Sequence, residues 1–143
     1  MKKYYSKIKE NKLLHCVVNV DDFDDFDERL DISDPSEFLQ ISLVKSKNRK
    51  VKAHKHLKCD RSVNSTQETC IVLSGKTVFS MYDLDGTWIS DEILNAGDSF
   101  ITFAGGHALE TLDEETCIYE IKNGPYEGVE MDKEYLKGIN DEK

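Results

Sequence analysis

Short apolar runs, separated by turn residues at regular intervals, constrain the fold of this chain more than any other feature. Asp85-Gly86 and Gly97-Asp98 are two of the turns, and Ser74-Gly75 is a third. Such pairs between strand-length runs are typical of antiparallel hairpins. The spacing therefore predicts an all-β sandwich or barrel. The expected strands are residues 14–20, 38–44, 51–56, 69–73, 77–82, 87–94, 99–103, 108–112 and 116–122.

Little of the chain has a helical pattern. Residues 21–34 carry eight acidic residues and are expected to form one helical turn or a loop. A polar turn is expected at residues 47–50, and a short helix is expected around residues 131–136. The chain of 143 residues suits one domain. We divide it into an N-terminal strand with the acidic segment (1–36), a strand-rich body (37–122) and a tail (123–143).

Charge and cysteine usage limit the classes of partner and compartment. The formal net charge of −9 argues against nucleic-acid binding, which needs a basic stripe. The apolar runs are too short for a membrane span or a secretion signal, so no membrane partner is expected. None of the four cysteines forms a CxxC pair, which favours free thiols in a reducing cytoplasm. Cys59 is either a loop thiol or an additional metal ligand, because it lies three residues after His56.

Two histidines in the expected strand 51–56 indicate a metal site. His54 and His56 would share one face and lie about 7 Å apart, because side chains alternate across a strand. Imidazole ligands suit a divalent transition metal, namely Fe, Mn, Ni, Co, Cu or Zn. The alternative is a polar pocket that holds no ion.

Glu68 and His107 are the other two candidate ligands. Glu68 has the same strand parity as Cys70 and Val72, so it faces the interior if they do. A buried carboxylate needs a partner or a metal ion. His107 follows two glycines, which let the backbone bend and turn the imidazole inward. Four protein ligands would leave one or two positions on the metal for water or substrate.

The spacing of these residues resembles the two sequence motifs of the cupin superfamily. His54-x-His56, followed by Glu68 and Gly75, is similar to the first motif, and Gly97-Asp98 with Gly105-Gly106-His107 is similar to the second. The resemblance covers residues 38–122. It implies a jelly-roll barrel whose metal ligands are His54, His56, Glu68 and His107. Because residues 57–67 separate the parts of the first motif, Gln67 is the alternative to Glu68.

A narrower resemblance bears on function. Thr66-Gln67-Glu68, Gly105-Gly106-His107 and Gly124-Pro125-Tyr126 are similar to segments of small single-domain cupins found near cell-surface polysaccharide genes. This resemblance implies sugar chemistry but no particular reaction. From the open positions on the metal we expect a metal-dependent enzyme acting on a small polar substrate, such as a sugar or sugar nucleotide, by isomerase-, epimerase- or oxygenase-like chemistry. Two alternatives remain open. One is a non-catalytic ligand-binding cupin, and the other is a metal-free sugar-nucleotide isomerase that uses histidine as acid and base.

Three residues are expected to contact the substrate. Arg61, like its neighbour Lys58, would meet an anionic group, and Tyr82 and Tyr119 would transfer protons. An open-ended jelly roll also exposes strand edges that a second copy can cover, so a homodimer is expected.

Overall fold

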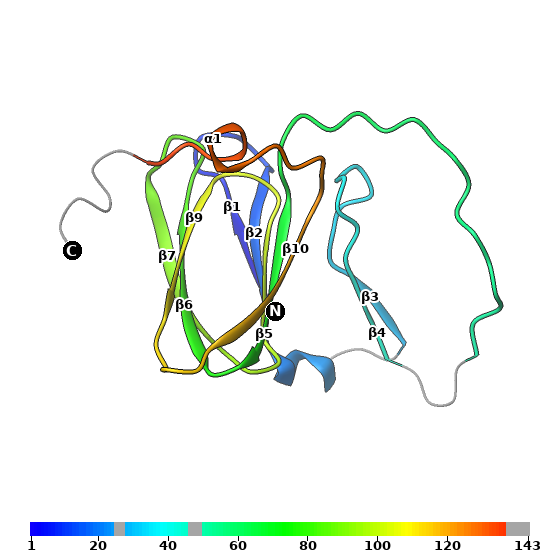
Figure 1. Cartoon of the computed structure of the whole chain (residues 1–143), viewed down its shortest axis with the longest axis horizontal. Helices are drawn as coiled ribbons and strands as arrows, with labels where there is room; N and C mark the ends of the chain where they lie inside the picture. Colours follow the sequence, from blue (N-terminus) through cyan, green and yellow to red (C-terminus); the bar gives the residue numbers. More distant parts are fainter. Residues whose placement is uncertain (25–27, 46–49, 137–143) are drawn as a thin grey trace.

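Two facing antiparallel sheets form the body of the molecule (Figure 1). The computed structural model describes residues 1–24, 28–45 and 50–136. One sheet has the strand order β1 (Lys2–Tyr5), β2 (Leu13–Val18), β8 (Ser99–Thr102), β5 (Glu68–Ser74) and β10 (Cys117–Lys122). The other has the order β7 (Trp88–Asn95), β6 (Lys76–Tyr82) and β9 (Gly106–Thr111). The predicted all-β class is therefore confirmed. No helix in the described part is both long and apolar enough to cross a membrane.

The main core lies between the two sheets. Phe79 of β6 stacks on Phe100 of β8 with ring centroids 4.5 Å apart, and both side chains are buried. Val72, Met81 and Leu94 complete the apolar contact and are fully shielded from water. This cluster holds residues from both sheets, so it fixes how one sheet faces the other.

A second core covers the outer face of the larger sheet. Cys16, Val18 and Ile101 point outward there and pack beneath residues of a small hairpin, β3 (Arg29–Asp31) and β4 (Ser42–Val44). Ile32 lies between these two strands and is 2% exposed. Because both faces of β2 are covered, all six of its residues are buried.

Asp98 holds one of the predicted turns in place. Its carboxylate accepts hydrogen bonds from the backbone N–H groups of Val20 (2.8 Å) and Asn95 (2.9 Å). Gly97, just before it, has φ +94°, a conformation that favours glycine. The Gly97-Asp98 pair therefore has a structural role in the turn before β8.

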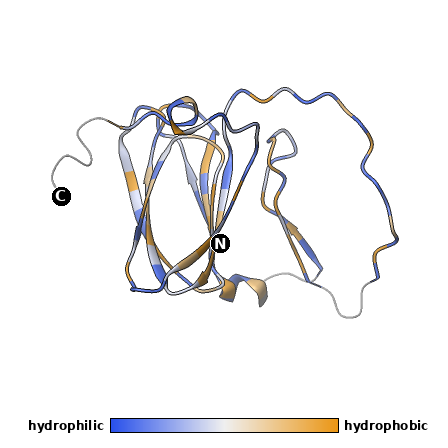
Figure 2. Ribbon diagram, viewed as in Figure 1, coloured by the Kyte–Doolittle hydropathy of each residue, from blue (hydrophilic) through white to orange (hydrophobic). Residues whose placement is uncertain are grey.

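Residues 50–66 differ most from the expectations. The predicted strand 51–56 does not form, and every residue from 50 to 66 is exposed and lies outside helices and strands. The segment is largely hydrophilic (Figure 2). Its lysines alternate with apolar residues and histidines, so it offers too little apolar surface to offset the entropy cost of ordering a strand. Val51 and Leu57 remain 63% and 83% exposed.

Three smaller expectations also need correction. The expected strand 38–44 is reduced to β4, which pairs with β3 and with neither large sheet. The short C-terminal helix, α1 (Val129–Asp132), begins and ends earlier than expected. Within the described residues the sheets do not close into a barrel, since β9 and β10 are the last strands of their sheets. The turn expected at residues 47–50 lies, except for Lys50, outside the described residues.

Replacing Phe100 should reveal how much the intersheet contact contributes. Phe100→Ala removes a buried ring that contacts Phe79, so we expect the free energy of unfolding to fall by about 3–5 kcal/mol. Urea denaturation measures this change. Leu57→Ala is the control, because Leu57 is exposed and its loss should change stability by no more than about 0.5 kcal/mol. Equal effects of the two substitutions would contradict the assigned core.

Candidate metal and ligand site

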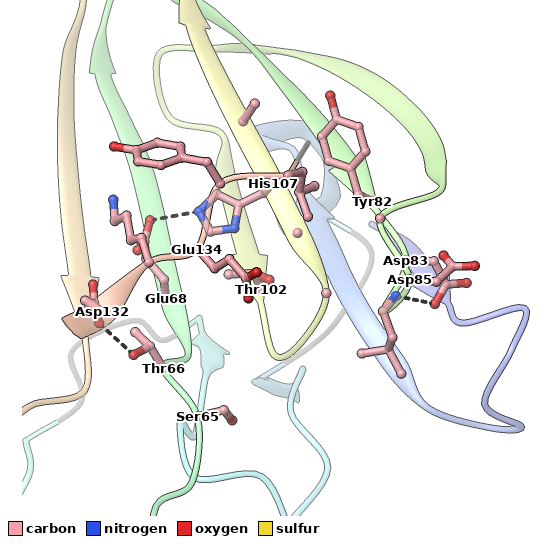
Figure 3. A pocket seen from close by; sticks show the side chains of 18 residues that line it. Ser65, Thr66, Glu68, Tyr82, Asp83, Asp85, Thr102, His107, Asp132 and Glu134 are labelled. Carbon is pink, nitrogen blue, oxygen red and sulfur yellow. Dashed lines mark hydrogen bonds and ion pairs between the residues drawn. The ribbon is translucent and has the colours of Figure 1, made fainter. Parts of the chain in front are cut away.

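A pocket of about 1010 Å³ lies at one end of the sandwich, where both sheets contribute strand ends (Figure 3). In one sheet Glu68 at the start of β5 pairs with Thr102 at the end of β8. In the other sheet Tyr82 at the end of β6 pairs with Gly106 at the start of β9. All four residues line the pocket, together with His107. The antiparallel register thus brings polar groups from distant parts of the sequence to one place.

Glu68 and His107 face each other across the pocket (Figure 3). The Oε1 atom of Glu68 lies 3.5 Å from Nε2 of His107, and Glu68 is only 6% exposed. Burial disfavours the charged carboxylate. The imidazole of His107, the thiol of Cys70 and the charge of Lys133 outweigh that effect, so the pKa of Glu68 lies below its ordinary value. Glu68 is therefore an ionised carboxylate at neutral pH.

Cys70 and Glu120 extend this pair into a cluster that could hold a metal ion. Ligand atoms of Glu68, Cys70 and Glu120 all lie within 4.8 Å of one another. Cys70 and Glu120 are direct cross-strand partners on β5 and β10, and Glu120 is the exposed member. Burial first, and the Glu68 carboxylate second, raise the pKa of the Cys70 thiol. A bound cation would instead favour the deprotonated form of Cys70, because metal ions are bound by the thiolate.

Carboxylates dominate the lining of the pocket. Lys133 is the one lysine or arginine among the described residues that line it. The lining carboxylates are Glu68, Asp83, Asp85, Asp132 and Glu134. This balance of charge favours a cation or a neutral polar molecule over an anion.

The structure brings together only two of the four predicted metal ligands, Glu68 and His107. His54 and His56 both lie in the exposed segment 50–66 and do not line the pocket. Their rings contact each other with centroids 5.4 Å apart, and Nδ1 of His54 lies 2.9 Å from the carbonyl oxygen of Lys52. The prediction that they share one face of a strand is wrong for this structure, because the strand does not form.

Gln67 does not take the place of Glu68. Its side chain points to the opposite face of β5, where its amide oxygen accepts a hydrogen bond from the Leu39 N–H at 2.7 Å. Its amide nitrogen donates to Glu37 at 2.6 Å. Cys70 and Val72 lie in the core between the sheets, so the predicted strand parity that turned Glu68 inward is confirmed.

The other predicted contact residues are divided between the pocket and the surface. Tyr82 lines the pocket and is 6% exposed. Arg61 and Cys59 lie in the exposed segment 50–66, outside the pocket lining. Tyr119 is 57% exposed on the outer face of β10, and it does not line the pocket either.

Sequence reasoning missed His15, which is completely buried below the pocket. Nε2–H donates to the carbonyl oxygen of Tyr82 at 3.1 Å, and the ring stacks on Phe100. Nδ1 is buried and has no hydrogen-bond partner among the described residues. The sequence feature that could have revealed His15 is its position in the apolar run Leu13–Val18. It has the same strand parity as Val17, which faces the main core.

His15 and Gly105 together support the bend that precedes His107. Gly105 has φ +82°, and a Cβ atom there would lie 2.5 Å from the Tyr82 carbonyl oxygen and 3.2 Å from Nε2 of His15. Only glycine fits this close approach without displacing the His15–Tyr82 hydrogen bond. The Gly105-Gly106 pair therefore acts as the predicted bend, and His15 is a positioning residue beneath it.

Comparison of the chain with models of known families, with curated proteins and with solved structures gave no match.

His15 should make the stability of the protein depend on pH between 7 and 5. Burial, the larger effect, lowers its pKa from 6.5 to about 4. As the pH falls below 6.5, the unfolded chain takes up a proton that the folded chain does not. Stability is therefore full above pH 6.5, and about 2 kcal/mol of it should be lost by pH 5. Denaturation with urea at several pH values measures this slope.

The matched variants are His15→Gln and His54→Gln. His15→Gln removes the buried titrating group, so the loss of stability between pH 7 and pH 5 should become smaller by about 2 kcal/mol. His54 is exposed, so His54→Gln should keep the slope of the wild type. If His15→Gln retains the full slope, another group is responsible for it.

Proposed function

We propose that one divalent transition metal binds at the edge of the pocket through Glu68, Cys70 and Glu120, with His107 of the pocket lining as a fourth ligand. One observation carries this proposal. Oε1 of Glu68 lies 3.5 Å from Nε2 of His107 and 3.4 Å from Sγ of Cys70. Both distances fall within the range of about 3.3–3.8 Å that separates the ligand atoms of a tetrahedral ion with bonds of about 2.0–2.3 Å. His107 is not in the group of Glu68, Cys70 and Glu120 whose ligand atoms lie within 4.8 Å of one another, so its ring would move toward Cys70 to complete the set. Zn²⁺ and Co²⁺ suit a mixed set of nitrogen, oxygen and sulfur ligands best.

The metal would act beside a space large enough for a small polar molecule. A bound ion supplies a Lewis acid that polarises a carbonyl or lowers the pKa of water. The hydroxyl groups of Tyr82 and Thr102 line the same pocket and can orient the molecule. The function we propose is a metal-dependent enzyme, isomerase-, epimerase- or oxygenase-like, and the cupin resemblance supplies the sugar as substrate class.

The charge of the lining refines this substrate class. A sugar nucleotide carries a diphosphate, which needs cationic partners. Arg61, the residue expected to supply one, lies outside the pocket, and five carboxylates line it. A neutral sugar suits these walls better than a sugar nucleotide.

The proposal also includes a cupin-like fold, a homodimer and a cytoplasmic location. Two facing sheets with Glu68 on one and His107 on the other support a jelly-roll, cupin-like arrangement. The outer edges of β9 and β10 support association as a homodimer through edge strands. All four cysteines are free, which supports a cytoplasmic location.

The second candidate function is metal-free acid–base catalysis. Its support is the His107–Glu68 pair itself, because a carboxylate beside an imidazole orients the ring and stabilises its charged form. A chelator separates the two candidates, since it should abolish a metal-dependent activity and leave acid–base catalysis unchanged. Ligand binding without turnover would instead identify a binding protein.

Metal binding by the purified protein tests the first proposal. The wild type should bind about one equivalent of Zn²⁺ or Co²⁺ by elemental analysis. Glu68→Gln and His107→Ala should each weaken the affinity at least about tenfold, since even outer-shell partners contribute that much. The Co²⁺ protein should show a thiolate-to-cobalt absorption band. Cys70→Ser should remove this band, while Cys117→Ser, an exposed cysteine on β10, should keep it.

The exposed histidines provide the decisive comparison. In the arrangement proposed here His54→Ala binds metal as well as the wild type, because His54 lies outside the pocket. Loss of the metal in His54→Ala would mean that the segment 50–66 closes onto the pocket and completes the four-ligand set of the cupin resemblance. No metal uptake by the wild type would leave acid–base catalysis or simple ligand binding.

A further inference from the structure

The segment that follows β10 crosses the end of the sandwich where the pocket opens. In Figure 1 it runs above the strand ends of both sheets, and α1 lies within it. Residues 132–136 belong to the pocket lining, although they are more than sixty positions from Glu68 in the sequence. The pocket wall formed by these residues is therefore separate in sequence from the strands that carry Glu68 and His107.

A polar contact holds the segment on one side of the pocket. The carboxylate of Asp132 accepts a hydrogen bond from Oγ1 of Thr66 at 2.9 Å (Figure 3). It also pairs with Nζ of Lys122 at 3.1 Å. Thr66 lies two residues before β5, and Lys122 is the last residue of β10. Asp132 thus ties the segment to two neighbouring strands of the larger sheet.

An apolar contact holds the segment on the other side. Leu136 lies against two glycines of the smaller sheet and its hairpin. A Cβ atom at Gly106 would be 2.7 Å from Cδ1 of Leu136, and one at Gly86 would be 3.5 Å from Cδ2. The leucine therefore occupies a notch that exists because neither position carries a side chain.

Asn123 anchors the start of the segment, because its side chain accepts a hydrogen bond from the Gln67 N–H at 2.6 Å and donates one to the Ser65 carbonyl oxygen at 3.3 Å. Between Gly128 and Asp132 the segment is loosely attached. Gly128 has φ +108°, and no atom lies within 4 Å of the place where its Cβ would be. None of the residues of α1 is buried. A segment with few buried contacts opens at low free-energy cost compared with the core.

We propose that residues 129–136 form a lid that opens about Gly128, with Asp132 and Leu136 as its two latches. Opening exposes the Glu68–His107 pair further, whereas closing leaves 8% of the Glu68 side chain and 27% of the His107 side chain exposed and places Lys133 in the pocket wall. The charge of Lys133 is one of those that favour the Glu68 carboxylate. Asp132 and Glu134 of the lid also line the pocket, so closing adds more negative than positive charge to the pocket wall and favours the retention of a cation.

The rate of carbethoxylation by diethyl pyrocarbonate, followed by mass spectrometry, tests the lid on metal-free protein. His107 reports on the pocket, and His54 and His56 are exposed references. His15, which is fully buried, reports on unfolding. Asp132→Ala and Leu136→Ala should each speed the reaction of His107 about tenfold, the effect expected from losing a contact to a charged or buried group. The other histidines should react at unchanged rates.

Two further variants complete the test. Met131→Ala is the matched control, because Met131 is in α1 but 75% exposed, and it should leave the rate at His107 unchanged. A disulfide between Thr66→Cys and Asp132→Cys should lock the lid and slow the reaction of His107 until a reductant is added.

Equal rates at His107 in the wild type, both latch variants and the locked protein would overturn the proposal. If the latch variants also expose His15, they have unfolded, and the locked protein decides the question on its own. The test needs no metal, so its outcome is independent of whether the pocket binds one.

Discussion

The stacking of Phe79 on Phe100 joins the two sheets, and the pocket depends on this contact. Phe100 also stacks on His15, and its ring centroid lies 5.8 Å from that of His107. One buried aromatic side chain therefore links the core, the residue beneath the pocket and a candidate ligand. Because packed interiors transmit small shifts, a change in the spacing of the sheets would also change the distance between His107 and Glu68.

The site combines groups whose individual burial is unfavourable. A buried carboxylate is costly, and so is a thiolate in the same surroundings. Glu68 stays ionised because His107 and Cys70 contact it and Lys133 lies in the same pocket wall. Cys70 stays protonated because burial, and after it the Glu68 carboxylate, raises the pKa of its thiol. A divalent cation would satisfy both groups together, although Cys70 also packs in the main core.

Two irregular segments near the pocket, residues 50–66 and residues 129–136, are attached to the sheets differently. Residues 50–66 lead into the larger sheet at β5 but form no strand themselves, and only Ser65 and Thr66 among them line the pocket. Residues 129–136 cross the pocket mouth and are held by a polar and an apolar contact. Access to the Glu68–His107 pair thus depends on loosely held chain, whereas the pair itself rests on strands fixed by the core.

The sequence by itself determined the all-β class, most strand positions and the inward direction of Glu68. These properties follow from local rules, namely turn residues, strand-length runs and alternation of side chains. It could not determine whether residues 51–56 form a strand, because that depends on burial against a partner. Nor could it show His15 beneath the pocket or Glu120 beside Cys70. The tertiary structure decided these contacts, since register between distant strands sets which side chains meet.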